Sequence, residues 1–446
     1  MDLNSVYVVA QNLTAGQPTI NSATSVQTNE NNLRTKESGI YLQEEMALLD
    51  DRLSLLAGLL AERSSLNGDT GKYYVFPKAA AVFSLLAPSK GGESTTLGGF
   101  DTFRVRAAYG EAGNRPNYGF KFTPLLTTVN IDGNAGIVIG GPNNGPPTLG
   151  DANIEPERQR EYEIGTDMAL KDQRVVLELS VYQRSISNLL LQRALPTSTG
   201  FTTQFSNGGG LRNRGVEAAV QVRPVAMKGI DWTSRATLTL NRSTVTDLPD
   251  HLPFDITAAG FGAGLGAYRI EEGKSATQII STINANGDVA VAGNGEPDFR
   301  VGWSNVLNAG DFTFSALLDW QHGSKVVNLT RLLYDFSANT EDFEAGAMRI
   351  ASFSAGDPRP YIEDASFVKL REISATYTVP KRMLTELRPL QNLQISVSAR
   401  NLLTITDYTG LDPEVSNFAG QPIGRNFDVA PYPPSRSFWL SLTAGI

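Results

Sequence analysis

Apolar and polar residues alternate one by one over several long stretches of this chain, up to its last residues. Near the C-terminus, two stretches over 393–400 and 438–446 place Leu, Ile, Val, Ala or Phe at every second position. Side chains of a strand point alternately to opposite faces, so each stretch predicts a strand with one apolar and one polar face. Because the pattern recurs in a chain without cysteine, it indicates a large antiparallel sheet.

The same alternation predicts many more strands upstream. Clear examples cover 103–109, 161–170, 175–181, 216–223 and 232–241, and further strands begin near Phe299, Phe312 and Phe367. The segment 39–62 predicts two strands around the turn Asp50–Arg52, although Leu53–Ala61 alone could also form a helix, because Leu and Ala favour helices. Residues 1–32 are rich in Asn, Thr, Gln and Ser and predict at most one strand, around Val6–Val9.

Strand length and loop length favour a membrane barrel over a soluble sheet. Roughly 14 strands of about 9 to 13 residues are predicted, longer than the usual 5 or 6 of soluble sheets and close to what a tilted strand needs to cross a bilayer. Short turns at 50–52, 171–173 and 308–311 alternate with long loops at 114–151, 249–266 and 329–360. The stretch 114–151 is so rich in Gly, Pro and Asn that no regular strand is expected there. Short turns at one end and long loops at the other are typical of a membrane barrel, whereas a sandwich has shorter strands and more frequent turns.

The apolar faces carry no charge in the clearest strands. A charged residue on a lipid-facing position costs about 2–4 kcal/mol at the bilayer midplane, so a barrel needs one uncharged face. Aromatic residues also gather near strand ends, where membrane barrels carry interfacial girdles, although exposed aromatics of a soluble protein would look the same. These aromatic residues are Tyr73, Tyr74, Trp232, Trp320, Tyr377, Phe438 and Trp439.

Composition narrows the function classes. Hydrophobic residues make up 41% of the 446 residues, the mean hydropathy is −0.18, and no apolar run approaches the ~18 residues of a transmembrane helix. The net charge of −8 argues against nucleic-acid binding, which calls for a basic patch. The absence of cysteine excludes disulfides and thiolate metal sites. Met1–Ala10 lacks the basic and apolar regions of a signal peptide, so no export signal is visible.

The sequence predicts no catalytic, cofactor-binding or metal-binding residue. His251 and His322 lack other ligand residues at metal-binding spacing. The string Gly273–Ser275 ends like a phosphate-binding loop, but Tyr268 stands where that motif needs its first glycine. Leu265 likewise breaks a dinucleotide-binding pattern within the glycine-rich run 260–266.

Adjacent acidic pairs also give no catalytic signal. Glu44–Glu45 and Glu271–Glu272 are neighbours in sequence, and such pairs are expected to be solvated rather than catalytic. The chain is therefore expected not to be an enzyme and to need no cofactor.

Several strings resemble segments of the SusC/RagA family of TonB-linked outer-membrane proteins (TonB-dependent receptors). Their order and spacing match across roughly residues 38–446, and the C-terminal third is the most specific part. The strings are RVRAAYG at 104–110, the segment 157–191, RGVE at 214–217, YIEDASFVKL at 361–370, YTVP at 377–380, ARNLL at 399–403, GLDPEV at 410–415 and PSRSF at 434–438.

This resemblance implies an antiparallel transmembrane β-barrel in the outer membrane of a Gram-negative-type bacterium. Family barrels have about 22 strands and are wide enough to need a plug. They import oligosaccharides or peptides, with a SusD-like surface lipoprotein as lid and TonB as the source of energy. The implied function is therefore TonB-dependent nutrient uptake, with outer-membrane lipid around the barrel and no nucleic acid as partner.

This sequence departs from the family pattern in several ways. It has no recognisable plug domain, TonB-contacting segment or export signal, and it ends in Ile446 where such barrels usually end in Phe. We therefore expect a polar segment at 1–32 and the C-terminal portion of a receptor barrel at 33–446, a fragment that is not competent for transport alone. A smaller self-closed barrel acting as a passive pore and a soluble extracellular β-rich binding module are the alternatives. The long loops 114–151 and 329–360 are candidates for substrate contact by location alone.

Overall fold

The fold is described from a computed structural model of the 446-residue chain. The residues that the structure describes are 2–13, 15–17, 19–86, 99–131, 134–141, 146–256, 267–281, 289–385, 389–414 and 426–445. Within these residues, none of the helices is long and apolar enough to cross a membrane.

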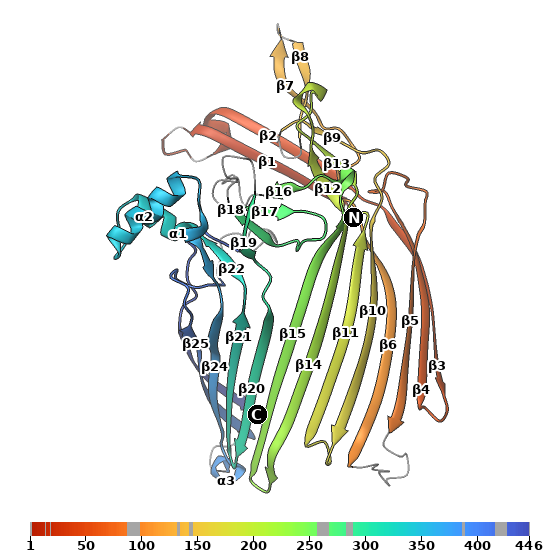
Figure 1. The fold of residues 1–446 in the computed structure, drawn as a ribbon, viewed down its shortest axis with the longest axis vertical. Helices are drawn as coiled ribbons and strands as arrows, with labels where there is room; N and C mark the ends of the chain where they lie inside the picture. Colours follow the sequence, from red (N-terminus) through yellow and green to blue (C-terminus); the bar gives the residue numbers. More distant parts are fainter. Residues whose placement is uncertain are drawn as a thin grey trace.

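A wall of long antiparallel strands dominates the molecule (Figure 1). Within the described residues its sheet has 13 strands in the order β27-β25-β24-β21-β20-β15-β14-β11-β10-β6-β5-β4-β3. All neighbours along the wall follow one another closely in the chain, as expected for an up-and-down barrel. The strands are β3 (Glu37–Leu48), β4 (Leu53–Ser64), β5 (Tyr74–Leu86), β6 (Phe100–Asn114), β10 (Glu157–Leu170), β11 (Val175–Ser187), β14 (Gly210–Met227), β15 (Ile230–Asp247), β20 (Phe299–Ala309), β21 (Phe312–His322), β24 (Phe367–Thr378), β25 (Asn392–Ile405) and β27 (Ser437–Gly445).

Short elements from the long connections gather beyond one end of this wall. They form small sheets of two to four strands and two helices. These elements are β1 (Asp2–Leu13), β2 (Ala23–Arg34), β7 (Leu125–Ile131), β8 (Asn134–Ile139), β9 (Thr148–Leu149), β12 (Leu190–Ala194), β13 (Thr203–Asn207), β16 (Phe254–Ile256), β17 (Ala267–Ile270), β18 (Gln278–Ser281), β19 (Ala290–Asn294), β22 (Lys325–Asn328), α1 (Leu329–Phe336), α2 (Phe343–Ser354), β23 (Ile362–Asp364) and β26 (Phe427–Asp428). A third helix, α3 (Lys381–Leu384), lies at the opposite end, between β24 and β25.

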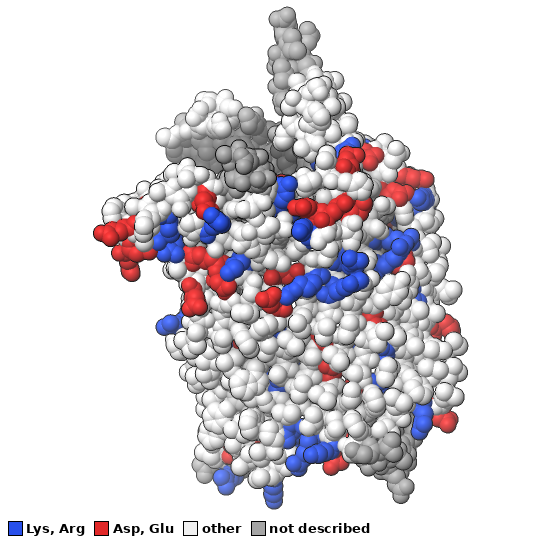
Figure 2. Space-filling view, viewed as in Figure 1, with Lys and Arg blue, Asp and Glu red and all other residues white. Residues whose placement is uncertain are grey.

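The register of the wall confirms the two faces that alternation predicts. Ile395 pairs with Leu442 and Val397 pairs with Leu440, so apolar residues of β25 and β27 share one face. The same row continues through the other strands, for example from Leu179 of β11 to Ala218 of β14. We call this side the apolar face and the other side the polar face. Figure 2 shows a broad band with few charged residues across the middle of the molecule, and more charged residues gathered above and below it.

Polar groups on the apolar face are hydrogen-bonded within the wall. The indole Nε1 of Trp303 donates to Ser234 Oγ at 2.8 Å, and Trp232 Nε1 donates to Asn305 Oδ1 at 3.3 Å. Thr166 Oγ1 donates to a backbone carbonyl oxygen at 2.9 Å. Because a buried or lipid-exposed donor without a partner is costly, these bonds let a few polar residues sit on this face. Edge strand β3 is an exception, because its Glu44 lies in the same row as Leu42 and Met46 with no such bond among the described residues.

The two classes of connection lie at opposite ends of the wall, as the loop lengths predict. Strands β3–β4, β10–β11, β14–β15 and β20–β21 are joined by two to four residues at one end. At the turn between β10 and β11, Lys171, Asp172 and Gln173 all have positive φ, near 54°, 57° and 59°. Leu53–Ala61 is a strand within β4, which confirms the hairpin interpretation over the helical one.

Three loop predictions are wrong in part. The segment 329–360, expected as a loop, holds α1 and α2, and α1 begins where Asn328 Oδ1 accepts a hydrogen bond from the backbone N–H of Arg331. The segment 114–151, expected to lack strand, contains the paired strands β7 and β8. Residues 1–32 hold two strands rather than at most one, because β1 and β2 satisfy each other's backbone groups despite their polar side chains. The expected division of the chain at residue 32 stays a prediction.

Of the predicted girdle residues, Trp439 lies on the polar face, while Phe438 beside it lies on the apolar face. Trp232, Trp320 and Tyr377 lie near the ends of their strands on the apolar face, as predicted. Phe312 and Tyr377 pack together at the short-turn end, with ring centroids 4.8 Å apart.

Helices and small sheets from the connections between β15 and β27 share a hydrophobic core outside the wall. Its fully buried side chains include Ile279, Val327, Leu329, Tyr361 and Phe427. We call this unit the cap: it comprises β16–β19, β22, β23, β26, α1 and α2. Segments far apart in sequence therefore close the same small core.

A buried charge cluster holds α1 and α2 together within the cap. Asp335 of α1 receives two hydrogen bonds of 2.7 Å from the Arg349 guanidinium of α2. Tyr361 Oη donates to the same carboxylate at 2.8 Å. Burial would raise the pKa of Asp335, but the hydrogen bonds from Arg349 and Tyr361 hold it below its usual range. Arg349 also donates hydrogen bonds of 2.7 and 2.9 Å to the Asp342 carboxylate, and these bonds lower the pKa of Asp342.

A second carboxylate is buried in the cap without a cation. Asp428 of β26 accepts hydrogen bonds from the hydroxyls of Thr330 and Tyr408 and is only 1% exposed. Burial raises the pKa of Asp428, and burial together with this carboxylate raises the pKa of Tyr408. The two hydroxyls supply the polar partners that a buried acid requires.

Replacing Arg349 by Met is expected to destabilise the cap by about 3 kcal/mol, because it leaves the Asp335 carboxylate buried and unpaired. Hydrogen exchange of peptides from α1 and α2 measures this loss. Arg359→Met is the matched control: its partner is Asp357 and its side chain is 64% exposed, so it should leave the exchange of these peptides nearly unchanged. Equal effects of the two variants would contradict the role of the buried pair.

Candidate functional site

The polar face of the wall carries a ladder of ion pairs along neighbouring strands. Arg106 of β6 bonds to Asp167 and Ser180 and lies 3.4 Å from Glu163 Oε1. Gly165 leaves room for this guanidinium, because a Cβ there would lie 2.7 Å from Arg106 Cζ. Charged side chains on this face are thus cross-linked to one another.

The pairs continue across the next strands of the same face. Arg184 Nε lies 2.8 Å from Glu161 Oε2, and Arg235 lies 3.0 Å from Glu178. The face is therefore hydrophilic over its width, which suits contact with water rather than with a dry core.

A further cluster of charged residues on this face, the Lys369 network, holds a connecting segment against the wall. Lys369 of β24 is buried, and its Nζ donates to Asp412 Oδ1 and Oδ2 at 2.6 and 2.8 Å. The same Nζ donates to Glu414 Oε2 at 2.7 Å. Asp412 and Glu414 belong to the segment 406–414 that leaves β25 at the long-connection end. This segment is thus held against the polar face.

Two arginines extend the network to neighbouring strands. Arg371 of β24 lies 2.6 Å from Asp319 Oδ2 and 2.7 Å from Glu414 Oε2. Arg300 of β20 contacts the same two carboxylates at 2.8 and 3.1 Å. Three cations and three carboxylates therefore join β20, β21, β24 and the segment after β25. The face of Phe367 lies 4.8 Å from Lys369 Nζ and adds a cation–π contact.

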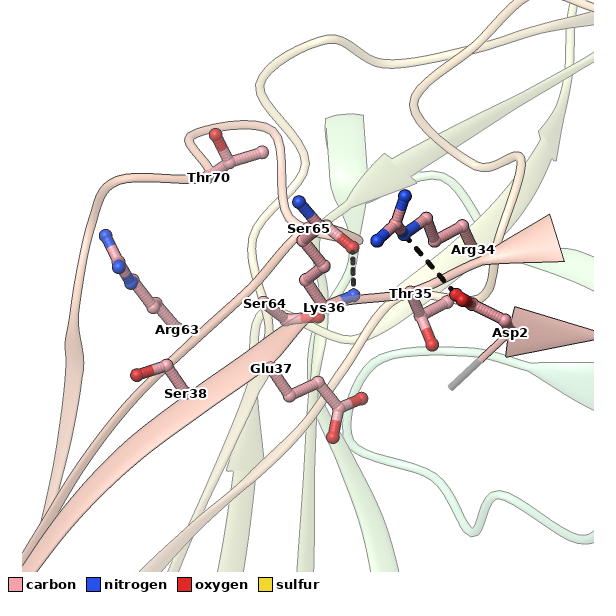
Figure 3. Close-up of a pocket in the computed structure, with 10 residues that line it drawn as sticks. All are labelled: Asp2, Arg34, Thr35, Lys36, Glu37, Ser38, Arg63, Ser64, Ser65 and Thr70. Atoms are coloured by element: carbon pink, nitrogen blue, oxygen red, sulfur yellow. Dashed lines mark hydrogen bonds and ion pairs between the residues drawn. The ribbon is translucent and has the colours of Figure 1, made fainter.

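A hollow lies where the β1–β2 hairpin departs from the wall (Figure 3). Its volume is about 810 Å³, and it is open to solvent beside the edge of β3. Lys36 N donates to Ser65 Oγ at 2.9 Å, while Asp2 and Arg34 form an exposed ion pair of 3.4 Å across the hairpin. Its lining is charged and hydroxylated, without an apolar floor that would hold a small molecule.

The structure places the residues that the sequence analysis considered in separate surroundings. His322 Nδ1 lies 3.4 Å from Ser366 Oγ, and its ring packs 5.4 Å from that of Phe299. Gly273 and Lys274 form a turn tied by backbone hydrogen bonds to Val245 of β15. Glu44 and Glu45 point to opposite faces of β3. The run 260–266 and the residues Val415 and Ile446 lie outside the described residues.

His251 has acidic neighbours that its sequence context does not predict. Its Nδ1 lies 2.8 Å from Glu272 Oε1, and Asp247 is the third member of this exposed group. The hydrogen bond with Glu272 raises the pKa of His251, which is the behaviour of an ion pair. The expectation of no metal ligand stays a prediction.

The residues that sequence reasoning missed are those of the Lys369 network. Lys369, Asp412 and Glu414 lie in the strings at 361–370 and 410–415 that carry the family resemblance. Composition gives no signal for their contact, because 43 residues separate Lys369 from Asp412.

Comparison with known proteins assigns the family. Residues 3–402 match the model of the TonB dependent receptor-like β-barrel. The TonB-dependent receptor P3 of Formosa agariphila is 26% identical over 427 residues, which cover 83% of this chain and 42% of that protein. The TonB-dependent receptor SusC of Bacteroides thetaiotaomicron is 22% identical over 67% of this chain and 33% of its own length.

Solved structures share the fold. The RagAB peptide transporter superposes with a TM-score of 0.75 at 18% identity, covering 97% of this chain and 50% of the other. The outer membrane transporter YddB from Escherichia coli gives a TM-score of 0.51 at 12% identity, covering 98% of this chain and 48% of the other. The chain spans under half the length of the curated relatives it matches. From the strand wall, its two faces and the match over 3–402, the protein belongs to the TonB-dependent receptor β-barrel family and resembles its SusC/RagA type.

Proposed function

We propose that this chain forms part of the wall of an outer-membrane importer that takes up bulky nutrients, oligosaccharides or peptides, in a TonB-dependent way. The observation that carries the proposal is the division of one long-stranded sheet into an ion-paired polar face and an apolar face whose middle rows carry no charge outside edge strand β3. In this proposal the apolar face meets lipid and the polar face lines the water-filled interior. The long connections then lie at the cell surface and the short turns in the periplasm.

The proposed partners follow from the relatives. The RagAB structure is titled a peptide transporter, and SusC is a TonB-dependent receptor. We infer that a SusD-like surface lipoprotein covers the extracellular end and that TonB acts through a plug domain. The network around Lys369 supports placing the long connections at the extracellular end. It holds one of these connections, the segment 406–414, against the polar face at that end.

We also propose that this chain closes into a barrel only with further strands. Among the described residues, β3 and β27 each have a strand neighbour on one side only. Their free N–H and C=O groups would each cost several kcal/mol in lipid. A wall with two such edges is therefore a portion of a larger barrel rather than a transporter by itself.

The β1–β2 hairpin indicates how the β3 edge is completed. Asp2 of β1 pairs with Arg34 of β2. The pairing is antiparallel, so residues earlier in β1 lie opposite residues later in β2. Only Thr35 and Lys36 separate β2 from β3. A strand leading into β1 in this register would run along the edge of β3 and fill the hollow of Figure 3. We thus interpret the hollow as the place of a strand rather than of a ligand.

Reconstitution of the purified 446-residue chain into liposomes tests the proposal. We expect detergent-dependent solubility and no swelling in sugar solutions, because the wall alone does not enclose a pore. Swelling would show a self-closed passive pore instead. A chain that stays soluble without detergent and shows no heat-dependent mobility on gels would show a soluble binding module.

The assignment of faces predicts opposite effects for two adjacent residues of β15. Leu238 lies on the apolar face and Thr239 on the polar face. Leu238→Arg is expected to cost about 2–4 kcal/mol of folding stability in lipid, because it places a charge among acyl chains. Thr239→Arg is the control and should be nearly neutral. Urea unfolding in lipid vesicles measures both, and similar losses would contradict the assignment.

The Lys369 network is expected to hold the segment 406–414 in place. Lys369→Met leaves Asp412 and Glu414 crowded without their shared cation, which should cost about 3 kcal/mol locally. Lys325→Met is the control, because Lys325 pairs with Asp364 at 3.0 Å in a more exposed position. Protease cleavage within 406–414 reports release, and it should increase in the first variant alone. Unchanged cleavage in both would exclude an anchoring role.

A further inference from the structure

A belt of arginines crosses the apolar face of four neighbouring strands at the long-connection end. It consists of Arg158 and Arg160 on β10, Arg212 and Arg214 on β14, and Arg242 on β15. These positions continue the rows that hold apolar residues lower in the wall, such as Ile164 on β10 and Val216 on β14. Figure 2 shows Lys and Arg atoms gathered across these strands, above the band with few charged residues.

Strand β11 runs through the middle of the belt and adds hydrogen-bonding groups. Its residues Gln183, Ser185 and Ser187 occupy the same face. Ser185 pairs with a belt arginine on each side, and Gln183 and Ser187 each pair with one. Gln183 Oε1 accepts a hydrogen bond from Arg214 Nε at 2.7 Å. The belt is thus a continuous surface of guanidinium, hydroxyl and amide groups.

The belt is only partly neutralised. Glu111 lies 2.8 Å from Arg158 Nε and 3.1 Å from Arg160 Nε, and Asp298 lies 2.6 Å from Arg242. Five cations therefore share two carboxylates. Among the described residues, none forms an ion pair with Arg212 or Arg214.

Two of the arginines face each other directly. Arg214 of β14 pairs in register with Arg242 of β15. Like charges directly opposite each other in a sheet are destabilising. Asp298 offsets the charge of Arg242, whereas the side-chain partner of Arg214 is the neutral Gln183. A bound anionic group would offset the charge of Arg214.

The height of the belt fits a lipid headgroup. Tyr162 and Tyr109 pack together on the apolar face, with ring centroids 4.9 Å apart and ring planes tilted by 39°. Across the sheet, Tyr162 pairs with Gln183, Gln183 with Arg214, and Arg214 with Arg242. Arg160 lies two residues before Tyr162, nearer to the long connections. Aromatic residues mark the boundary between acyl chains and headgroups. The guanidinium groups thus begin where the acyl chains end.

We propose that this belt binds the phosphate groups of a phosphorylated glycolipid in the outer leaflet of the membrane. This inference rests on the proposed function, because it requires the apolar face to meet lipid. Guanidinium groups bind phosphate oxygens through paired hydrogen bonds, and Arg is favoured over Lys for this contact. The acyl chains of the same lipid would lie along the apolar rows below, so headgroup and chains meet one continuous surface.

The test measures binding of the refolded full chain to phosphatidylcholine vesicles with and without bis-phosphorylated lipid A. We expect preference for the lipid A vesicles and loss of this preference when the lipid is dephosphorylated. Arg212→Gln/Arg214→Gln removes the two arginines without carboxylate partners and should weaken binding to lipid A vesicles about tenfold or more. Binding to phosphatidylcholine alone should not change.

Arg104→Gln/Lys228→Gln is the matched control for charge. It removes the same two positive charges from the polar face of β6 and from the β14–β15 turn. Its affinity for lipid A vesicles should stay within about twofold of the unmodified chain. Equal weakening by both double variants, or no preference of the unmodified chain for phosphorylated lipid, would overturn the proposal.

A separate readout distinguishes failure of this inference from failure of the proposed function. Heat-dependent gel mobility reports whether each variant forms a folded membrane-inserted wall. If the unmodified chain lacks that behaviour and still lacks it when the strands that complete the barrel are supplied, the membrane assignment itself is wrong and the lipid proposal falls with it. If mobility is intact and lipid preference is absent, only the headgroup site is refuted.

Discussion

Backbone hydrogen bonding between neighbouring strands is the constraint on which the rest of this molecule depends. A strand in lipid has no water to satisfy its N–H and C=O groups, so each must pair with the next strand. The 13-stranded order satisfies this for every strand except the outer sides of β3 and β27, among the described residues. The two faces, the connections and the cap are all built on that ladder.

The two faces of the sheet accommodate polar groups in different ways. On the apolar face, the few polar atoms are bonded within the wall, as in the contact of Trp303 with Ser234. On the polar face, charges neutralise one another, as Arg106 does with Glu163 and Asp167. Paired charges keep this face polar without a strong field of one sign. The Lys369 network uses the same chemistry to hold the segment 406–414 against this face.

The cap shows how long connections become ordered structure. Residues from β17 to β26 that are far apart in sequence enclose one core, with Tyr268 packing edge-on against Phe427 at 5.6 Å. Buried carboxylates are tolerated there in two ways: Asp335 has a cation, and Asp428 has two hydroxyl donors. This order at the long-connection end contrasts with the short turns at the other end, where positive φ values reverse the chain within a few residues.

The sequence by itself determined the strands, their faces and the asymmetry of the connections, because alternation and turn residues are local properties. It also contained a helical signal at 329–336, with Leu329, Leu332, Leu333 and Phe336 at helical spacing. Only the tertiary structure decided that Lys369 meets Asp412 and that Arg214 faces Arg242. Such contacts depend on strand register and on the return of distant connections, and no local pattern encodes either. Open edges are likewise a property of the assembled sheet.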